Sequence, residues 1–425
     1  MAQKPNVLIF GGCNSLSPQL ALHLVPLQGE PLVNHIRMVD KFSLFPQTTY
    51  VSKEFIKLLQ DRSDVIEYRQ ANLTVPATVT KCFTDPAPNG QPYTHVFDLS
   101  GETAYDRPTA IQISHTFNVS LNLAREAAKQ NVKAYIRNIG AVYDHVTEKK
   151  KYKEDDVDGW KPLGVRGVWW HETMRAVASV PNLPLVVIRK AYAYGPGETH
   201  GEVTQTILLG LVYKHLDEAM KFLWAPKLKR HTVHTKDVAG VAWTAAQWAA
   251  GLDREKMNAL AGVSLPPSGD DSVKGVPGAI QKEQGGVVVP LFNLVDDNDW
   301  NQENTAAVIS KVFGIKFGFH GIFASQLAKL RLETVVEDIN GVHMEEWTKI
   351  IATYANPPVP FTPLSPYALQ YQLEKHGCAL DGEKLKKVLG YKFLHPYFTE
   401  ETVRETIESY RVDGIWPQTD KYPPF

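Results

Sequence analysis

Near its start the chain reads Val7-Leu8-Ile9-Phe10-Gly11-Gly12-Cys13-Asn14-Ser15-Leu16-Ser17, an apolar run that breaks into a glycine turn. In a dinucleotide-binding fold, the first strand passes into its phosphate-binding helix in this way. The glycine pattern is incomplete, because Asn14 and Ser17 stand where G-x-x-G-x-x-G would place its second and third glycines. Asn14 is the mildest replacement if its position needs a positive φ, and Ser17 is small enough for close helix–strand packing.

Apolar strands and amphipathic helices alternate through the first half of the chain. The apolar runs predict strands at 7–10, 35–39, 65–68, 95–99, 133–138 and 185–189. The patterns between them predict helices at 18–25, 111–130 and 168–180. Such alternation predicts an α/β fold, a doubly wound parallel sheet of the Rossmann type with helices on both faces.

The second half of the chain has a mixed pattern. It predicts helices at 204–216, 238–248 and 301–313, a strand at 287–294, and an exposed insertion at 265–286 that is rich in Pro, Gly and Ser. We therefore expect a dinucleotide-binding Rossmann domain at 1–195, completed by about 228–250 and 287–314. Residues 196–425 are expected to form a smaller, mixed and discontinuous substrate-binding part.

Composition narrows the class of protein. The chain has 425 residues, is 44% hydrophobic and carries a net charge of -1. This charge gives no sign of a nucleic-acid or anionic-membrane partner, and no apolar run is long enough to span a bilayer. Cys13, Cys82 and Cys378 are odd in number and far apart, which argues against a disulfide framework or a zinc site. No signal-peptide pattern precedes the first strand, so the cytoplasm is the expected compartment.

A run of acidic and amide residues, Asp296-Asp297-Asn298-Asp299, places four oxygen-bearing side chains in a row. A hard cation prefers such ligands. The run lies just before the predicted helix at 301–313, so Asp299 or Asn301 as the N-cap is the simpler explanation. No metal is therefore predicted.

The residues expected to contact a dinucleotide follow the ends of the first four strands. They are Gly11, Gly12, Asn14, Ser15, Leu16, Asp40, Asn72, Leu73, Leu99, Ser100 and Gly101. Backbone N–H groups of a glycine turn can approach a pyrophosphate at a helix N-terminus. Asp40 ends the second strand, where a carboxylate accepts hydrogen bonds from the adenosine ribose. This favours NAD as the cofactor, while Arg37 and Lys41 leave NADP open.

Segments along the whole chain resemble one family, the extended short-chain dehydrogenase/reductases of the NAD-dependent epimerase/dehydratase type. The first segment, at 10–17, is similar to the family's T-G-G-x-G-F-I-G. Further segments are Asp98–Thr103 (H-L-A-A-x-T), Asn118–Leu123 (N-V-x-G-T-x-N-L), Ala141–Asp144 (S-x-V-Y-G), Arg189–Gly197 (R-P-x-x-V-Y-G-P-G) and Val233–Ala239 (V-H-V-D-D-V-A). Phe292–Leu294 and Asp381–Tyr391 are similar to the family's last strand and tail. The resemblance implies a Rossmann fold, NAD or NADP as cofactor and a small-molecule substrate.

The family's chemistry uses a Ser or Thr before V-Y-G and a Tyr-x-x-x-Lys pair on the next helix. The tyrosine moves a proton while the nicotinamide moves a hydride. In this chain no hydroxyl side chain occurs from Arg137 to Val142, and neither Tyr nor Lys occurs between Lys161 and Arg189. The tyrosine position falls near Gly164 and the lysine position near Val168. We therefore expect the fold and the cofactor to carry over, but not the standard reaction.

Other polar residues could act as acid or base in such a site. The candidates are Tyr143, His171 and Tyr194, each of which also has a packing or capping role as its alternative. The pair Trp169-Trp170 is expected to fill the space of the missing side chains or to pack the helix on the sheet rather than to stack on a substrate.

Two functional hypotheses follow. One is an oxidoreductase or epimerase-type enzyme with non-standard acid and base residues, acting on a carbonyl or sugar-nucleotide-like substrate. The other is a catalytically silent NAD(P)-binding, scaffold or regulatory protein. The family often dimerises through helices that correspond here to Ile111–Gln130 and Val168–Val180, so the resemblance also leaves a homodimer open.

Overall fold

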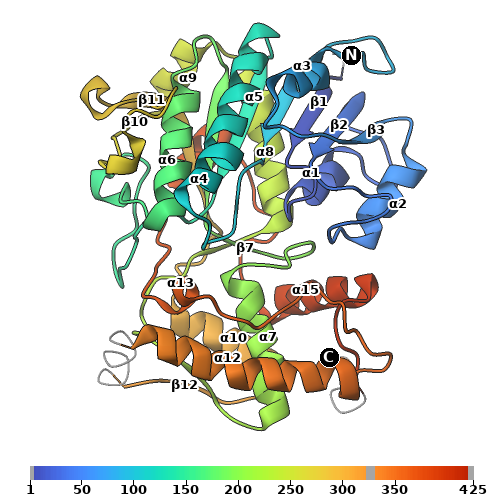
Figure 1. The fold of residues 1–425 in the computed structure, drawn as a ribbon, viewed down its shortest axis with the longest axis vertical. Coiled ribbons are helices and arrows are strands. Elements are labelled where there is room, and N and C mark those ends of the chain that lie inside the picture. Colours follow the sequence, from blue (N-terminus) through green and yellow to red (C-terminus); the bar gives the residue numbers. More distant parts are fainter. Residues whose placement is uncertain (1–3, 322–330, 420–425) are drawn as a thin grey trace.

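The computed structural model describes residues 4–321 and 331–419, and a single eight-stranded sheet forms its centre (Figure 1). The strand order is β10-β11-β6-β5-β4-β1-β2-β3. All neighbours pair in parallel except β10 and β11, which pair antiparallel. The strands are β1 (Asn6–Phe10), β2 (His35–Asp40), β3 (Ile66–Gln70), β4 (Tyr93–Asp98), β5 (Ala134–Ile139), β6 (Leu185–Lys190), β10 (Gly262–Leu265) and β11 (Val287–Leu294).

Helices cover both faces of this sheet. Alternate residues of β1 show the division, because Val7 and Ile9 lie in one apolar core while Leu8 and Phe10 lie in the other. The first core contains α1 (Ser17–Leu24), α2 (Lys53–Asp61), α8 (Thr235–Ala250), α9 (Arg254–Ala261) and α14 (Glu383–Leu389). The second contains α3 (Pro76–Thr84), α5 (Asn118–Lys129) and α6 (Gly164–Ala178). A strand buried on both faces is an unbroken apolar run in the sequence. The alternation of strands and helices could therefore be predicted from the sequence.

A third apolar core holds together a separate group of helices, in the lower part of Figure 1. These are α7 (Glu202–Leu216), α10 (Gln302–Phe313), α12 (Leu332–Lys349) and α15 (Glu400–Asp413). Two short parallel ladders accompany them, β7 (Tyr192–Tyr194) with β9 (Thr232–His234) and β8 (Met220–Phe222) with β12 (Phe317–Phe319). The predicted fold class, a doubly wound sheet with a smaller mixed part, is confirmed; the domain boundaries and the substrate-binding role of the smaller part stay predictions.

Several elements differ from the sequence prediction. The helix expected at 168–180 begins earlier, at Gly164. The helix expected at 111–130 is α4 (Thr109–Gln112), a π-helical turn at 113–117 and α5. A short helix, α13 (Gln370–Leu373), follows α12 along the chain. Within the described ranges, no helix has both the length and the apolar character needed to cross a membrane.

The segment at 265–286 is not simply an exposed insertion. Leu265 belongs to β10, and Val273 and Ala279 are buried against the second core. Gly278 lies so close to α5 that an added Cβ would be 2.7 Å from Leu121 Cδ2. The turn-forming residues predicted a loop correctly, but the few apolar ones dock it on the helices.

Candidate functional site

A cavity of about 1260 Å³ opens at the carboxyl ends of the parallel strands. Its walls come from the loops after β1, β2, β3 and β4, from α6, and from the segments at 190–205 and 363–372. Ligands of doubly wound sheets bind at this edge, where adjacent loops diverge. Single drug-sized ligands occupy pockets of roughly 300–1,000 Å³, so this cavity has room for a ligand larger than those.

Ten of the eleven residues predicted to contact a dinucleotide line this cavity. They are Gly11, Asn14, Ser15, Leu16, Asp40, Asn72, Leu73, Leu99, Ser100 and Gly101. Gly12 is the exception, because it packs beneath the turn. An added Cβ there would lie 3.3 Å from Met38 Cβ and 3.3 Å from Val39 N. The structure thus brings the predicted residues together, while their contact with a cofactor stays a prediction.

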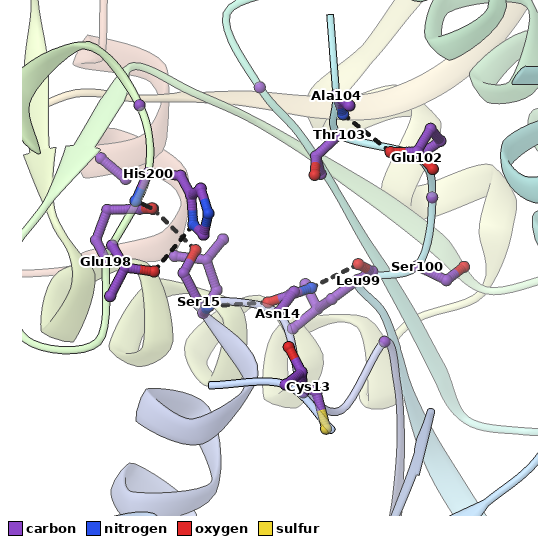
Figure 2. Close-up of a pocket in the computed structure, with 18 of the residues that line it drawn as sticks. Cys13, Asn14, Ser15, Leu99, Ser100, Glu102, Thr103, Ala104, Glu198 and His200 are labelled. Carbon is purple, nitrogen blue, oxygen red and sulfur yellow. Dashed lines mark hydrogen bonds between the residues drawn. The ribbon is translucent and has the colours of Figure 1, made fainter. Parts of the chain in front are cut away.

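The glycine turn is held by one glycine and one side-chain amide (Figure 2). Gly11 has a φ of 78°, and a Cβ on it would be 2.6 Å from Leu99 O. Asn14 is not among the residues with positive φ. Its Oδ1 instead accepts the N–H groups of Leu16 (2.8 Å) and Ser17 (3.1 Å), and its Nδ2 donates to Leu99 O (2.6 Å). Asn14 therefore replaces a glycine by capping the helix and tying the turn to β4, not by backbone freedom.

Most backbone donors of the turn are already used. The N–H groups of Gly11 and Gly12 donate to Val39 O, and that of Cys13 donates to Asp40 Oδ2. Among the described residues, the N–H of Ser15 has no hydrogen-bond acceptor. An anion at this helix N-terminus would therefore find the backbone of Ser15 as its open donor.

A carboxylate borders the same turn. The hydroxyl of Ser15 donates to Glu198 Oε2 at 2.8 Å, and the N–H of His200 donates to Glu198 Oε1 at 3.1 Å (Figure 2). Burial raises the pKa of Glu198 above its ordinary range. Sequence reasoning missed this residue, because Ser15 and Glu198 are 183 positions apart and nothing local pairs them.

Asp40 lies at the end of β2 and faces the cavity. It accepts the N–H groups of Cys13 (2.9 Å) and Lys41 (2.6 Å), and burial raises its pKa. A carboxylate has about four lone-pair positions, so it can still accept from a ribose hydroxyl. Arg37 donates instead to Glu67 and to backbone carbonyls beside α3, away from the cavity, whereas Lys41 lines it.

Helix α6 turns two side chains toward the cavity, Arg166 and Trp170. They are four residues apart, as the members of a Tyr-x-x-x-Lys pair would be, but lie two positions after those expected from the sequence. Gly164 begins the helix and Val168 is buried in the second core. Arg166 Nη2 lies 3.9 Å from where a Cβ on Gly140, at the end of β5, would stand.

The two tryptophans have different surroundings. Trp169 is fully buried and packs edge-on against Phe117. Trp170 donates its indole N–H to Glu102 O at 3.0 Å. Its ring packs against Gly101, where an added Cβ would be 2.8 Å from Trp170 Cζ2. The packing role expected for the pair fits Trp169, whereas Trp170 forms part of the cavity wall.

The three candidate acid or base residues lie away from the cavity walls. Tyr143 Oη is 3.1 Å from His171 Nδ1, and His171 Nε2 is 2.7 Å from Pro266 O. Tyr194 donates to Tyr397 O at 3.4 Å. All three are buried, which raises the pKa of both tyrosines and lowers that of His171. These contacts match the packing alternative, because none of the three faces the space where a substrate would lie.

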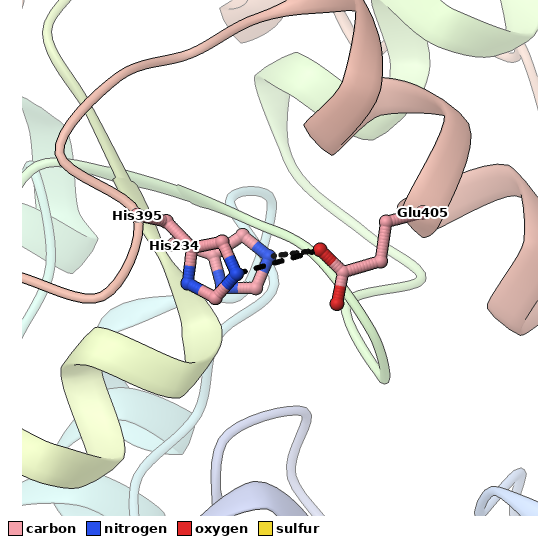
Figure 3. Close-up of side chains that lie close together, drawn as sticks. All are labelled: His234, His395 and Glu405. Carbon is pink, nitrogen blue, oxygen red and sulfur yellow. Dashed lines mark ion pairs between the residues drawn. The ribbon is translucent and has the colours of Figure 1, made fainter.

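Two histidines and a carboxylate meet outside the cavity, between α8 and α15 (Figure 3). His234 Nε2 and His395 Nε2 are each 3.5 Å from Glu405 Oε2, and the two rings stack with centroids 3.8 Å apart. His234 Nδ1 accepts the N–H of Lys236, which places the imidazole proton on Nε2. Lys236 also reaches Glu405 at 2.6 Å. Stacked rings, a protonated Nε2 and an adjacent ammonium favour a structural joint over a metal centre.

The acidic run at 296–299 forms the approach to α10. Asn301 caps this helix by accepting the N–H of Asn304 at 3.0 Å. Of the two N-cap residues that the sequence left open, Asp299 and Asn301, it is therefore Asn301. Asp299 instead contacts Lys229 (2.7 Å) and His231 (3.1 Å). The run therefore has structural partners along the chain.

No family model matches the sequence, and no curated protein matches it. Solved structures do match. The enzyme WbmG of Bordetella bronchiseptica, solved with NAD, is 15% identical with a TM-score of 0.58, over 98% of this chain and 96% of that one. UDP-glucose 4-epimerase of Thermotoga maritima, solved with UDP-glucose, is 14% identical with a TM-score of 0.57, over 96% and 98%. A dTDP-glucose 4,6-dehydratase of Streptomyces venezuelae, a double mutant solved with NAD, is 11% identical with a TM-score of 0.58, over 96% and 98%.

These matches extend over nearly the whole of each chain, so they cover both the sheet and the helical part beside it. At such identities the likeness concerns the path of the backbone and not the chemistry. It agrees with the sequence segments that resemble the same group of proteins. The chain has the fold of the extended short-chain dehydrogenase/reductases of the epimerase/dehydratase type.

Proposed function

We propose that the chain binds NAD in the cavity and is an oxidoreductase or epimerase-type protein with a non-standard site. The observation that carries this proposal is the placement of Asp40, Gly11 and Ser15 around one cavity at the carboxyl ends of the strands. The solved structures that share the fold include proteins crystallised with NAD, which supports the same choice of cofactor.

The residues present fit a dinucleotide in three places. The carboxylate of Asp40 is available to the adenosine ribose and would repel a 2′-phosphate, which favours NAD over NADP. The N–H of Ser15 and the N-terminus of α1 would meet the pyrophosphate. Asn72 and Leu73, after β3, line the wall where an adenine would lie. The nicotinamide would supply hydride transfer when bound.

The chemistry beside the nicotinamide would differ from that of the family. The cavity wall there has Gly140, Arg166 and Trp170 in the region of the Ser, Tyr and Lys of the resemblance. A guanidinium keeps its proton in proteins, so Arg166 can bind or polarise a group but cannot exchange a proton with it. Acid–base steps would therefore fall to other groups of the cavity.

A thermal-shift titration with NAD, NADH, NADP and NADPH tests the cofactor. A ligand at 100 times its Kd stabilises the folded state by about 2.7 kcal/mol, so NAD or NADH should raise Tm by several degrees and the two phosphorylated forms by less. A Tm that stays constant with all four dinucleotides would contradict the proposal that the chain binds NAD.

The absence of the standard hydroxyls and lysine favours a second candidate, a catalytically silent NAD-binding protein. The two candidates differ in whether a substrate is converted. Incubation with NAD or NADH and carbonyl or nucleotide-sugar substrates, followed by chromatography and mass spectrometry of the products, should show a new carbonyl, alcohol or epimer if the protein is an enzyme. A net oxidoreductase should also change the absorbance at 340 nm, whereas tight NADH binding without any product favours the silent protein.

A further inference from the structure

We propose that Arg166 and Lys190 together bind an anionic group of the substrate, a carboxylate or a phosphate, where α6 and the end of β6 line the cavity. The inference rests on the proposed function, because it takes the cavity to be a substrate site, and it adds the chemical class of that substrate. It follows from two cations that face one cavity and form no ion pair among the described residues.

Aromatic rings hold the guanidinium of Arg166 in place. Its central carbon lies 4.4 Å from the ring centroid of Tyr105 and 5.8 Å from that of Trp170. Its Nε is buried and has no hydrogen-bond partner among the described residues. Stacking engages the faces of a guanidinium and leaves its N–H donors at the edge, in the arrangement that binds carboxylate or phosphate through two parallel hydrogen bonds.

Lys190 ends β6 and lines the same cavity. Within the part of the chain that the structure describes, its ammonium forms no hydrogen bond or ion pair. Burial lowers the pKa of Lys190, and the positive charge of Arg166 lowers it further, while Glu198 acts in the opposite direction. In the segment that resembles R-P-x-x-V-Y-G-P-G, this lysine stands where the family pattern has proline.

The carboxylates nearby are already engaged. Glu198 accepts from Ser15 and His200, and Glu202 forms an ion pair with Arg230 at 2.9 Å. Arg166 and Lys190 are like charges in one partly desolvated cavity, and the carboxylate of Glu198 acts on Lys190 without forming a direct ion pair with it. An anion bound to both cations would relieve their repulsion and gain charge-assisted hydrogen bonds.

The rings around these cations indicate an organic anion. Tyr105, Trp170 and Tyr192 line the cavity beside Arg166 and Lys190. A ligand with a carboxylate or phosphate at one end and an unsaturated or apolar body at the other would match both the charge and the rings.

Calorimetric titration of the full-length chain tests the inference with three probes: benzoate, its neutral analogue benzamide, and inorganic phosphate. We expect benzoate to bind about tenfold more tightly than benzamide. Added salt should weaken the binding of benzoate but not that of benzamide. Arg166→Gln and Lys190→Met should each reduce the affinity for benzoate or phosphate by about fivefold or more. Lys161→Met, which removes an exposed cation outside the cavity, should leave it unchanged.

Equal affinity for benzoate and benzamide without phosphate binding, or anion binding that survives both substitutions, would overturn the inference. Arg166→Lys and Lys190→Arg keep the charge and separate a lost cation from a misfolded cavity, because they should retain part of the affinity. NAD titrated into the same variants separates the two proposals. Anion binding without NAD binding would contradict the proposed function alone, and NAD binding without anion binding would contradict this inference alone.

Discussion

Asn14 holds the turn after β1 together at a position where the resembled pattern has glycine. The sequence explanation was a backbone with positive φ, but Asn14 is not among the residues with positive φ, and its side chain has four hydrogen bonds. One consequence is that the helix N-terminus is partly satisfied from within the chain. A second is that the residue with the open donor, Ser15, also donates its hydroxyl to a carboxylate, Glu198.

Neutralising Glu198 should strengthen NAD binding. A pyrophosphate at the turn would be repelled by this carboxylate, and two unit charges about 6 Å apart interact by about 3 kcal/mol at an effective dielectric constant of about 20. Solvent in the open cavity screens about half of this, which leaves about 1.4 kcal/mol. We therefore expect Glu198→Gln to lower the Kd for NAD by about tenfold at pH 8. Glu148→Gln, which removes an exposed acidic residue, is the matched control.

The pH dependence of this effect has a definite sign. Burial raises the pKa of Glu198, so the carboxyl group is neutral at low pH and the repulsion disappears there. The wild-type affinity for NAD should rise as pH falls, and the gain from Glu198→Gln should shrink. A gain that is the same at pH 5 and pH 8 would show that charge is not the cause.

At the residue scale, the sequence predicted the positions that follow strand ends, such as Asp40 and Asn72, because parallel strands bring their carboxyl ends to one edge. It did not predict Arg166 or Lys190. The sequence showed that two side chains four residues apart on this helix should face the cavity, but it placed them two residues too early. The true start of α6 is Gly164, with a φ of 57°, and the sequence prediction did not find it. Glu198 depends on a contact between distant segments, which no local pattern encodes.

Helix α6 joins the cavity side of the sheet to the segment at 266–286. Glu172 and Arg175 form a buried ion pair at 2.6 Å. Glu172 also accepts the N–H of Ser268, and Arg175 donates to Ile280 O and Gly285 O. The pair therefore fastens the segment over the helix.

Removing one member of this pair should destabilise the protein strongly. Arg175→Met leaves Glu172 as an uncompensated buried charge, which costs about 3–5 kcal/mol. The unfolding free energy from urea titration should fall by this amount, and limited proteolysis should cut first within 266–286. The double variant Glu172→Leu with Arg175→Met should recover part of the loss. A loss below about 1 kcal/mol in the single variant would contradict the assigned role.

At the element scale, strands were predicted more closely than helices. Strands buried on both faces are continuous apolar runs, so their ends were found within one or two residues. The edge strand β10 was missed because half of its residues are exposed and it follows α9 directly. The segment at 266–286 partly covers the faces of α5 and α6 through which a homodimer could form. A homodimer through these helices stays a prediction.

The whole molecule consists of a sheet with two cores and a group of helices with a third, and the joint of His234, His395 and Glu405 connects them. Glu405 lies on α15, His234 precedes α8, and Asp237 accepts the N–H groups of Leu394 and His395. These bonds fix the helical wall of the cavity relative to the sheet.

Acid should weaken this joint in two stages. Burial lowers the pKa of His234, so its neutral form stabilises the fold and this contribution is lost as pH falls below about 6.5. The neighbouring His234 and Lys236 hold the pKa of Glu405 at about 2, against 4.5 ordinarily. Its contribution is present above pH 4.5 and is lost as pH falls toward 2.

Unfolding free energy measured from pH 8 to pH 3 should therefore decline with acid, and Glu405→Gln should flatten the decline below pH 4.5. Glu408→Gln, a more exposed glutamate on the same helix, is the control. Identical pH profiles for Glu405→Gln and the wild type would show that the joint contributes nothing.

The central claim is that this cavity binds NAD with Asp40 at the adenosine ribose. Calorimetric titration of NAD into the wild type and into Asp40→Ala tests it most directly, with Asp61→Ala as an exposed control on α2. Hydrogen bonds to a charged group contribute about 1.5–3 kcal/mol, so Asp40→Ala should weaken NAD binding by about tenfold or more while Asp61→Ala leaves it unchanged. Equal affinity in wild type and Asp40→Ala, or no NAD binding to the wild type, would contradict the account.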